Sequence, residues 1–240
     1  MLCTAFAVTT VSADVLNVAV ASNFTKTLKD LAADFESQTG HRVRVISGST
    51  GKLFTQVKHG APFDVFLAAD EKRPELLVAE GLADASSDHV YARGRLVFVS
   101  NISPLDTCQD VLMSPELIRL SIANPKTAPY GLAAKQVLQQ LSVWESLKAK
   151  LVRGENIAQA TQFVSTQNAQ AGFIARSLLQ LDKYIEYKCT WDVPLNMYAA
   201  IKQKMVVLSA SKMHQVAREF HRYIQSERAK KIIRQAGYDI

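Results

Sequence analysis

The chain has 240 residues, a formal net charge of +6 and a hydrophobic fraction of 48%. This is the composition of an ordinary globular protein that can build a core, and the length suggests one or two domains. Acidic residues are interspersed with the basic ones, and no helix-turn-helix, zinc or aromatic-basic RNA motif occurs. The charge therefore does not indicate a nucleic-acid partner.

The first 13 residues carry no charge and end in Val11-Ser12-Ala13. Small residues at the first and third of these positions are typical of a secretory cleavage site. We therefore predict that residues 1–13 are a signal peptide, truncated because the usual positive segment is missing. A disordered or strand-like N-terminus is the alternative.

Cleavage after Ala13 leaves two cysteines, Cys108 and Cys189. In an exported protein such a pair can form a disulfide, although two inert buried thiols fit the sequence equally well. The five histidines show no ligand spacing with these cysteines, so we predict no metal site.

From Asp14 onward, short apolar segments alternate with amphipathic ones, which predicts mostly parallel sheets with right-handed crossovers. In the first part of the chain we predict strands at 15–21, 42–46, 64–68 and 95–100 and helices at 25–39, 52–59 and 74–80. Next we predict helices at 114–117, 131–141, 143–147 and 157–166 and strands at 120–123, 171–175 and 184–188. Two helices, at 211–226 and 227–235, end the chain.

This order of elements predicts two lobes. We expect residues 14–95 plus 200–240 to form lobe 1 and residues 96–199 to form lobe 2. The crossing strands should lie at about 95–101 and 192–200.

Four predicted helix starts carry residues suited to an anion. The first N–H groups of a helix have no partner within it and the dipole there is positive, so facing helix starts can hold an anion without a charged side chain. The candidate residues are Ser22 and Asn23 in the first turn, Ser49 and Thr50 in the second, Tyr130 in the third and, through its backbone alone, Ile157 in the fourth. The plainer interpretation is that Ser49 and Thr50 only cap their helix and that Tyr130 is a core aromatic.

No enzyme motif accompanies these turns. The segment 48–52, Gly-Ser-Thr-Gly-Lys, lacks the first Gly of a phosphate loop and the hydroxyl residue after its Lys. Asp64 and Asp70 are isolated carboxylates that we interpret as structural caps. We therefore predict a binding protein rather than an enzyme, with no cofactor.

Several motifs together resemble the ModA family, the periplasmic molybdate-binding proteins of ABC transporters. They are Ala-Ser-Asn-Phe at 21–24, Ser-Gly-Ser-Thr-Gly at 47–51, the block at 59–70 with Gly-Ala-Pro-Phe-Asp and Ala-Asp, Asn-Pro at 124–125, Pro-Tyr-Gly at 129–131 and Gly-Tyr at 237–238. The resemblance spans residues 14–240.

The resemblance implies an α/β, two-lobed periplasmic binding protein fold of type II, each lobe a mixed, mostly parallel sheet flanked by helices, with the ligand cleft between the lobes. It implies a periplasmic monomer that captures molybdate, and tungstate, through neutral hydrogen bonds and delivers it to an ABC permease. The site it implies consists of Ser22, Asn23, Ser49, Thr50, Tyr130 and Ile157. A receptor for another oxyanion, such as sulfate, or for a small organic anion is the alternative.

Three details of this site stay open. The resemblance does not decide whether Ser49 or Thr50 donates its hydroxyl. Ala175 stands where many family members have a Tyr, so that contact is expected to be absent, with Tyr130 as a candidate replacement. Arg176 beside it is either an anion contact or a solvent-facing residue.

Overall fold

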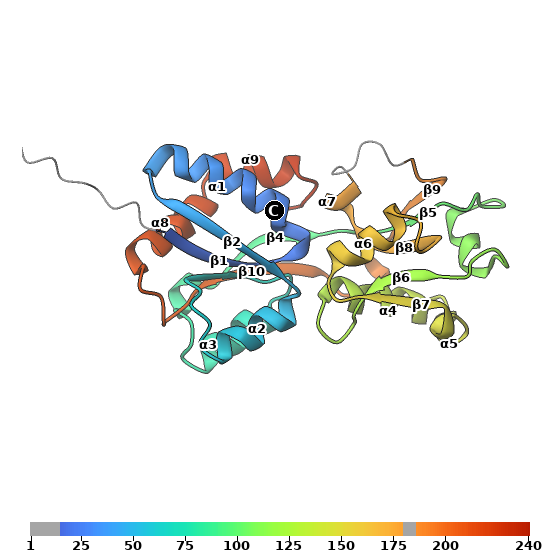
Figure 1. Ribbon diagram of the computed structural model, residues 1–240, viewed down its shortest axis with the longest axis horizontal. Coiled ribbons are helices and arrows are strands. Elements are labelled where there is room, and N and C mark those ends of the chain that lie inside the picture. The colour runs from blue at the N-terminus through green and yellow to red at the C-terminus, as the bar shows by residue number, and fades with distance from the viewer. Residues whose placement is uncertain (1–14, 180–185) are drawn as a thin grey trace, which may run out of the picture.

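The computed structural model describes residues 15–179 and 186–240, which form two α/β lobes lying side by side (Figure 1). The predicted signal peptide at 1–13 lies outside the described residues. None of the helices in the described part of the chain is long and apolar enough to cross a bilayer.

The first sheet has five strands in the order β2-β1-β3-β10-β4. They are β1 Val15–Ala21, β2 Arg42–Gly48, β3 Val65–Leu67, β4 His89–Gly94 and β10 Ile201–Val207. β1 runs parallel to β2 and β3, whereas β10 is antiparallel to both β3 and β4, so four of the five strands run in one direction. We call this sheet with its helices lobe 1.

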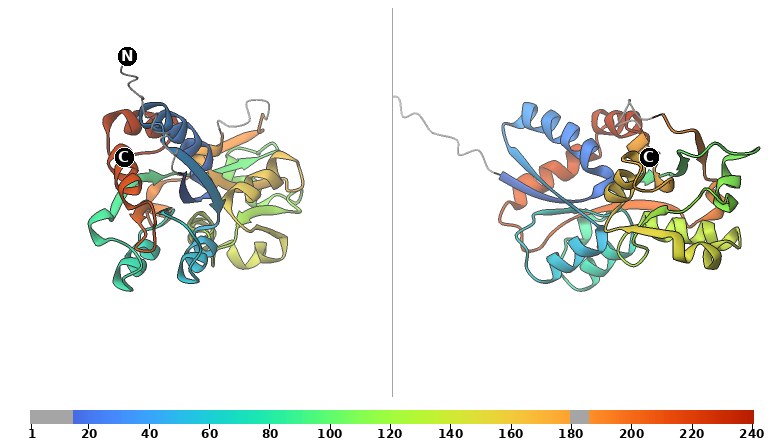
Figure 2. Two further views of the ribbon diagram at one scale, coloured as in Figure 1. Left: turned by 60° about the vertical axis from the view of Figure 1, so that its left-hand side comes forward. Right: turned by 45° about the vertical axis from the view of Figure 1, so that its right-hand side comes forward.

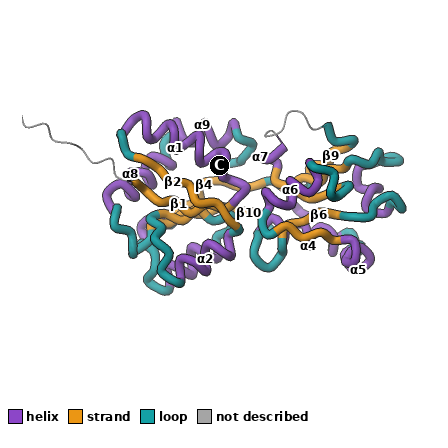
Figure 3. The backbone as a smooth tube through the Cα atoms, in the orientation of Figure 1, coloured by secondary structure: helices purple, strands orange, loops and turns teal. Residues whose placement is uncertain are grey.

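Helices cover both faces of the first sheet. They are α1 Thr25–Thr39, α8 His214–Ile224 and α9 Glu227–Gln235 on one face and α2 Thr50–Lys58 and α3 Lys72–Ala79 on the other (Figures 1 and 3). Alternate residues of β1 serve the two faces, as the period of a strand requires: Leu16 and Val18 join the core under α1, and Ala19 joins the core under α2.

The second sheet, in lobe 2, has the order β7-β6-β8-β5-β9. Its strands are β5 Leu96–Ser100, β6 Leu120–Ala123, β7 Leu151–Gly154, β8 Ala171–Ala175 and β9 Cys189–Asp192. Its helices are α4 Pro129–Gln140, α5 Trp144–Leu147, α6 Ile157–Ser165 and α7 Arg176–Leu179. The 3₁₀-helices of the two lobes are η1 Ser22–Phe24, η2 Ala85–Ser87, η3 Cys108–Met113, η4 Lys148–Lys150 and η5 Leu195–Met197. As in lobe 1, β6 is parallel to β7 and β8, and β5 is antiparallel to β8 and β9.

The chain passes between the lobes twice, on one side of the molecule. It leaves β4 and enters β5 at Arg95, and it returns from β9 to β10 over residues 193–200 (Figures 1 and 2). β4 with β10 and β5 with β9 occupy one edge of each sheet, whereas β2 and β7 form the opposite edges. The edges formed by β2 and β7 are therefore the parts of the two sheets farthest from the crossings.

The structure differs from the sequence predictions in three respects. The helix predicted at 114–117 is absent, and η3 forms earlier because Asp110 accepts the N–H of Thr107 at 2.7 Å and starts a turn there. Strands β4, β7, β9 and β10 were not predicted. The strand predicted at 184–188 lies partly outside the described residues, and its described positions, 186–188, are not in a strand.

Cys108 and Cys189 form a disulfide, with 5.6 Å between their Cα atoms. The bond ties η3 to β9 within lobe 2. Of the two alternatives that the sequence left open, the structure thus shows the disulfide.

Candidate functional site

The six predicted site residues line one small cavity between the lobes. The lining residues are Ala21, Ser22, Asn23, Gly48, Ser49, Thr50, Ala69, Ala128, Pro129, Tyr130, Asn156 and Ile157. The cavity is small, with a volume of about 10 Å³ open to the centre of a water-sized sphere. Each of the six predicted residues is at most 5% exposed, so the lobes are closed around this space.

Each turn of the cavity follows a strand and begins a helix. In lobe 1, β1 leads directly into η1 and β2 leads through Ser49 into α2. In lobe 2, β6 is followed by α4 and β7 by α6. Four helix starts and their positive dipole ends therefore meet at the cavity, as an anion site requires.

The cavity hydroxyls each accept a main-chain N–H. Ser22 Oγ accepts the N–H of Ala158 at 3.4 Å. Ser49 Oγ accepts the N–H of Lys52, also at 3.4 Å, and Thr50 Oγ1 accepts that of Ala69 at 3.2 Å. A hydroxyl that has accepted in this way keeps its own hydrogen for donation. Ser49 thus caps α2 and lines the cavity as well, so capping and ligand binding are not exclusive.

The turn before α4 depends on a glycine. A Cβ on Gly131 would lie 2.2 Å from the carbonyl oxygen of Ala123. The absence of a side chain lets α4 start directly against the end of β6, with Pro129 at the first helical position. This close approach places the main chain of Tyr130 at the cavity.

The turn before α6 contains a residue that the sequence reasoning missed. Asn156 lines the cavity and caps α6, because its Oδ1 accepts the N–H of Gln159 at 3.1 Å. An Asn directly before a helix is a known start signal, so the sequence did carry this information. Ile157 follows it with a buried side chain, which leaves its backbone for the cavity.

The Asn23 side chain is engaged within the protein. Its amide nitrogen donates to Gln203 Oε1 at 2.8 Å and to the Tyr238 hydroxyl at 3.0 Å. The Tyr238 hydroxyl in turn donates to the Asn23 carbonyl at 2.7 Å. Both amide hydrogens are therefore used, and the Asn23 side chain has none left to donate to a ligand in the cavity.

Tyr130 is both a core aromatic and a cavity residue. Its hydroxyl accepts from Gln203 Nε2 at 3.5 Å and occupies the space that a side chain on Gly94 would fill. Burial raises the pKa of Tyr130 well above its usual value, so the hydroxyl stays protonated. Its side chain reaches β4 and β10 of lobe 1.

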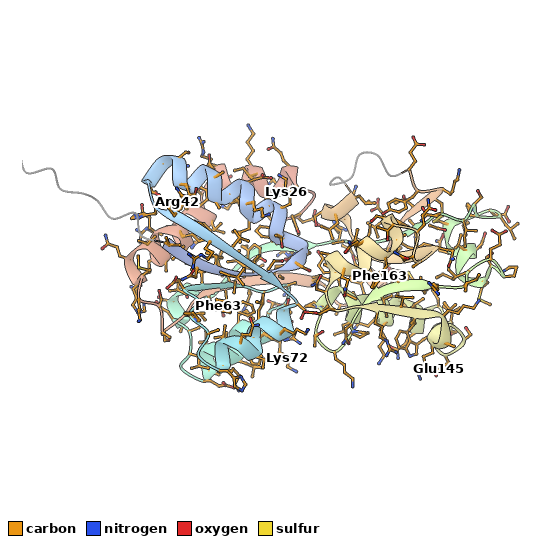
Figure 4. All side chains as sticks on the ribbon, viewed as in Figure 1. Lys26, Arg42, Phe63, Lys72, Glu145 and Phe163 are labelled. Carbon is orange, nitrogen blue, oxygen red and sulfur yellow. A yellow bond between two sulfur atoms is a disulfide. The ribbon has the colours of Figure 1, made fainter. Side chains whose placement is uncertain are left out.

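Among the residues that the structure describes, no charged side chain lines the cavity. Exposed charges such as Lys26, Arg42, Lys72 and Glu145 project from the outer surfaces of the lobes (Figure 4). Arg176 is half exposed, with Nη1 3.4 Å from Asp192 Oδ1. It is absent from the cavity lining, so the structure agrees with the solvent-facing alternative and not with an anion contact.

The two isolated carboxylates hold loops in place. Asp64 accepts the N–H of Asn17 and the hydroxyl of Ser211, both at 2.7 Å. Asp70 accepts the N–H of Arg73 at 3.1 Å and pairs with its guanidinium. Both match the predicted structural role.

Known proteins share this fold and sequence over nearly the whole chain. A family model described as bacterial extracellular solute-binding protein matches residues 16–239. The chain is 44% identical over 226 residues to the molybdate-binding protein ModA of Azotobacter vinelandii, covering 94% of this chain and 90% of the relative. It is 41% identical over 220 residues to ModA of Rhodobacter capsulatus, covering 92% of this chain and 86% of the relative.

A solved structure agrees with these relatives. The periplasmic molybdate-binding protein of Azotobacter vinelandii has a TM-score of 0.87 at 36% identity, covering 94% of this chain and 99% of that chain. The chain therefore belongs to the bacterial extracellular solute-binding protein family and is a binding protein rather than an enzyme. Within this family it belongs to the ModA proteins. The predicted family and the type II two-lobed fold are confirmed.

Proposed function

We propose that this protein captures molybdate in the periplasm and delivers it to the membrane permease of an ABC transporter. The observation that carries the proposal is the closed cavity between the lobes, lined by four helix starts and by no charged side chain. The 44% identity to a molybdate-binding protein supports molybdate as the anion.

The donors in this proposal are neutral. The hydroxyls of Ser22, Ser49 and Thr50 donate to the anion, and the N–H groups of Asn23, Tyr130 and Ile157 complete its shell. Both Ser49 and Thr50 contribute, because each hydroxyl already accepts an N–H and keeps a hydrogen to donate. Hydrogen bonds to an ionised acceptor are stronger than neutral ones, so several such donors stabilise a dianion.

The same set of donors gives selectivity. A fully deprotonated tetrahedral anion only accepts hydrogen bonds, whereas a protonated phosphate also brings a hydrogen that needs an acceptor. A site that presents donors disfavours the protonated anion, because its hydroxyl would be buried without a partner. Sulfate is smaller and would not reach both lobes at once. Tungstate nearly equals molybdate in size, so we propose that it binds too.

Binding in this scheme includes a hinge motion. Residues 14–95 plus 200–240 move as one lobe and residues 96–199 as the other, about the crossings near 95–101 and 192–200. The anion contacts both lobes only when they are closed, so it shifts the population toward the closed form. In this proposal the protein acts as a monomer, and its closed form is the one that the permease receives.

Isothermal titration calorimetry with molybdate, tungstate, sulfate and phosphate tests the proposal. We expect tight binding of molybdate and tungstate and weak or absent binding of the other two anions. Tight binding of sulfate or phosphate without molybdate heat would overturn the assignment and favour a receptor for another oxyanion.

A further inference from the structure

Two contacts join α2 of lobe 1 to lobe 2 outside the cavity. The N–H of Gly51 donates to the Thr127 carbonyl at 2.9 Å. The next residue, Lys52, places Nζ 2.7 Å from Glu155 Oε1. None of these four residues lines the cavity, so both contacts join the lobes without contributing to its wall.

The position of these contacts makes them sensitive to closure. α2 follows β2, and Glu155 follows β7. β2 and β7 are the outer strands on the side opposite the two chain crossings. A rotation about the crossings moves the points farthest from them by the largest distance, so the Lys52–Glu155 contact separates first when the lobes open. Thr127 follows β6, the neighbour of β7, so the Gly51–Thr127 contact separates soon after it.

We propose that Gly51 and Lys52 are closure residues: they position the two lobes around the bound anion without touching it. This inference rests on the proposed function, because the anion is what the closed lobes retain. Loss of either contact favours the open form. The apparent affinity for the anion then falls by the factor by which the population of the closed form falls.

A glycine is required at position 51 because the lobes approach each other closely there. The backbone conformation at this position does not itself require a glycine. A Cβ at this position would lie 3.0 Å from Thr127 Cα and 3.1 Å from both the Thr127 carbonyl oxygen and Arg73 Nη2. Gly51 lies in the first turn of α2 and is not among the described glycines with positive φ. Alanine is the better helix former. Gly51→Ala should therefore leave the lobe-1 fold intact or stabilise it while obstructing closure.

The ion pair adds a smaller effect. The side chains of Lys52 and Glu155 are 54% and 46% exposed, and exposed ion pairs contribute little. We expect Lys52→Gln or Glu155→Gln to weaken molybdate binding by about two- to fivefold. The reversed pair, K52E with E155K, should recover most of this loss.

The chain offers a matched control on the same helix. Lys58 Nζ lies 2.8 Å from Glu80 Oε1, and these side chains are 40% and 37% exposed. This pair joins the end of α2 to the residue after α3, within lobe 1. K58Q and E80Q thus remove a similar ion pair that does not cross between the lobes.

The test measures the molybdate Kd by calorimetry and the Tm of the ligand-free protein for each variant. We expect G51A to raise Kd at least about fivefold without lowering Tm, K52Q and E155Q to raise Kd as stated, and K58Q and E80Q to leave Kd unchanged. A merely structural role for Gly51 predicts the opposite pattern, with Tm and affinity changing together.

Three results would overturn the inference: a wild-type Kd in G51A, a loss of affinity in G51A matched by a loss of Tm, or equal effects of K52Q and K58Q. A wild-type protein that binds no molybdate would overturn the proposed function itself, and the two failures are therefore distinguishable.

Discussion

Ser49→Ala is the sharpest single perturbation of the cavity. It removes a hydroxyl that is buried at the start of α2 and, in our proposal, one donor to the dianion. A hydrogen bond to a charged group contributes about 1.5–3 kcal/mol. At 1.4 kcal/mol per factor of ten, the molybdate Kd should rise about 10- to 100-fold.

The same change removes a helix cap, which must be separated from the loss of affinity. Ser226 provides the control, because its hydroxyl caps α9 by accepting the N–H of Ala229 at 3.2 Å and lies outside the cavity. Each Ser→Ala variant should lose about 1 kcal/mol of stability, or about 2–4 °C in Tm for a chain of this size. Calorimetry should then find wild-type affinity in S226A and weak binding in S49A. Equal affinities in the two variants would refute the role of Ser49 as a donor.

Four further predictions follow from the described contacts. Tyr130→Phe should change the molybdate Kd by less than about threefold, because the Tyr130 hydroxyl faces Gln203 and the donor to the anion is its main-chain N–H. A loss of molybdate affinity above about tenfold in calorimetry would contradict this. Molybdate affinity should stay constant between about pH 6 and 9, since no lining side chain titrates there. Burial raises the pKa of Tyr130 and Tyr238, so these two tyrosines should not affect stability below about pH 10 and should lower it above that pH, as thermal unfolding at alkaline pH can check. Loss of the Cys108–Cys189 disulfide, which links positions separated by 81 residues, should cost about 4 kcal/mol in the chain-entropy model and lower Tm without changing Kd.

Local patterns in the sequence predicted the first strand and helix fully. Residues 15–21 and 25–39 match β1 and α1, because apolar periodicity is clear and Gly40 ends the helix with a φ of 76°. β7 was missed because it is only four residues long and mostly half exposed, so it has no apolar pattern to detect.

The cavity was predictable where a turn carries its own signal. Hydroxyl and amide residues at helix starts pointed to Ser22, Asn23, Ser49 and Thr50, and the fold brings them together. What the sequence could not provide is the partner of each group. The Asn23 amide meets Gln203 and Tyr238 across separations of 180 and 215 residues, and such contacts depend on the packing of the whole fold.

The closure contacts illustrate the same limit. Gly51 belongs to a Gly-Ser-Thr-Gly segment that suggests a ligand loop, yet its N–H is directed at Thr127 in the other lobe. Only the arrangement of the two sheets, with β2 and β7 opposite the crossings, distinguishes a residue that closes the lobes from one that holds the anion.

A crystal structure of the molybdate complex, with anomalous data collected at the molybdenum absorption edge, tests the central claim most directly. We predict one anomalous peak in the cavity, with its oxygens within about 3 Å of Ser22 Oγ, Ser49 Oγ and the N–H of Ile157. A peak elsewhere on the protein, or an anion held in this cavity by a charged side chain, would contradict the account.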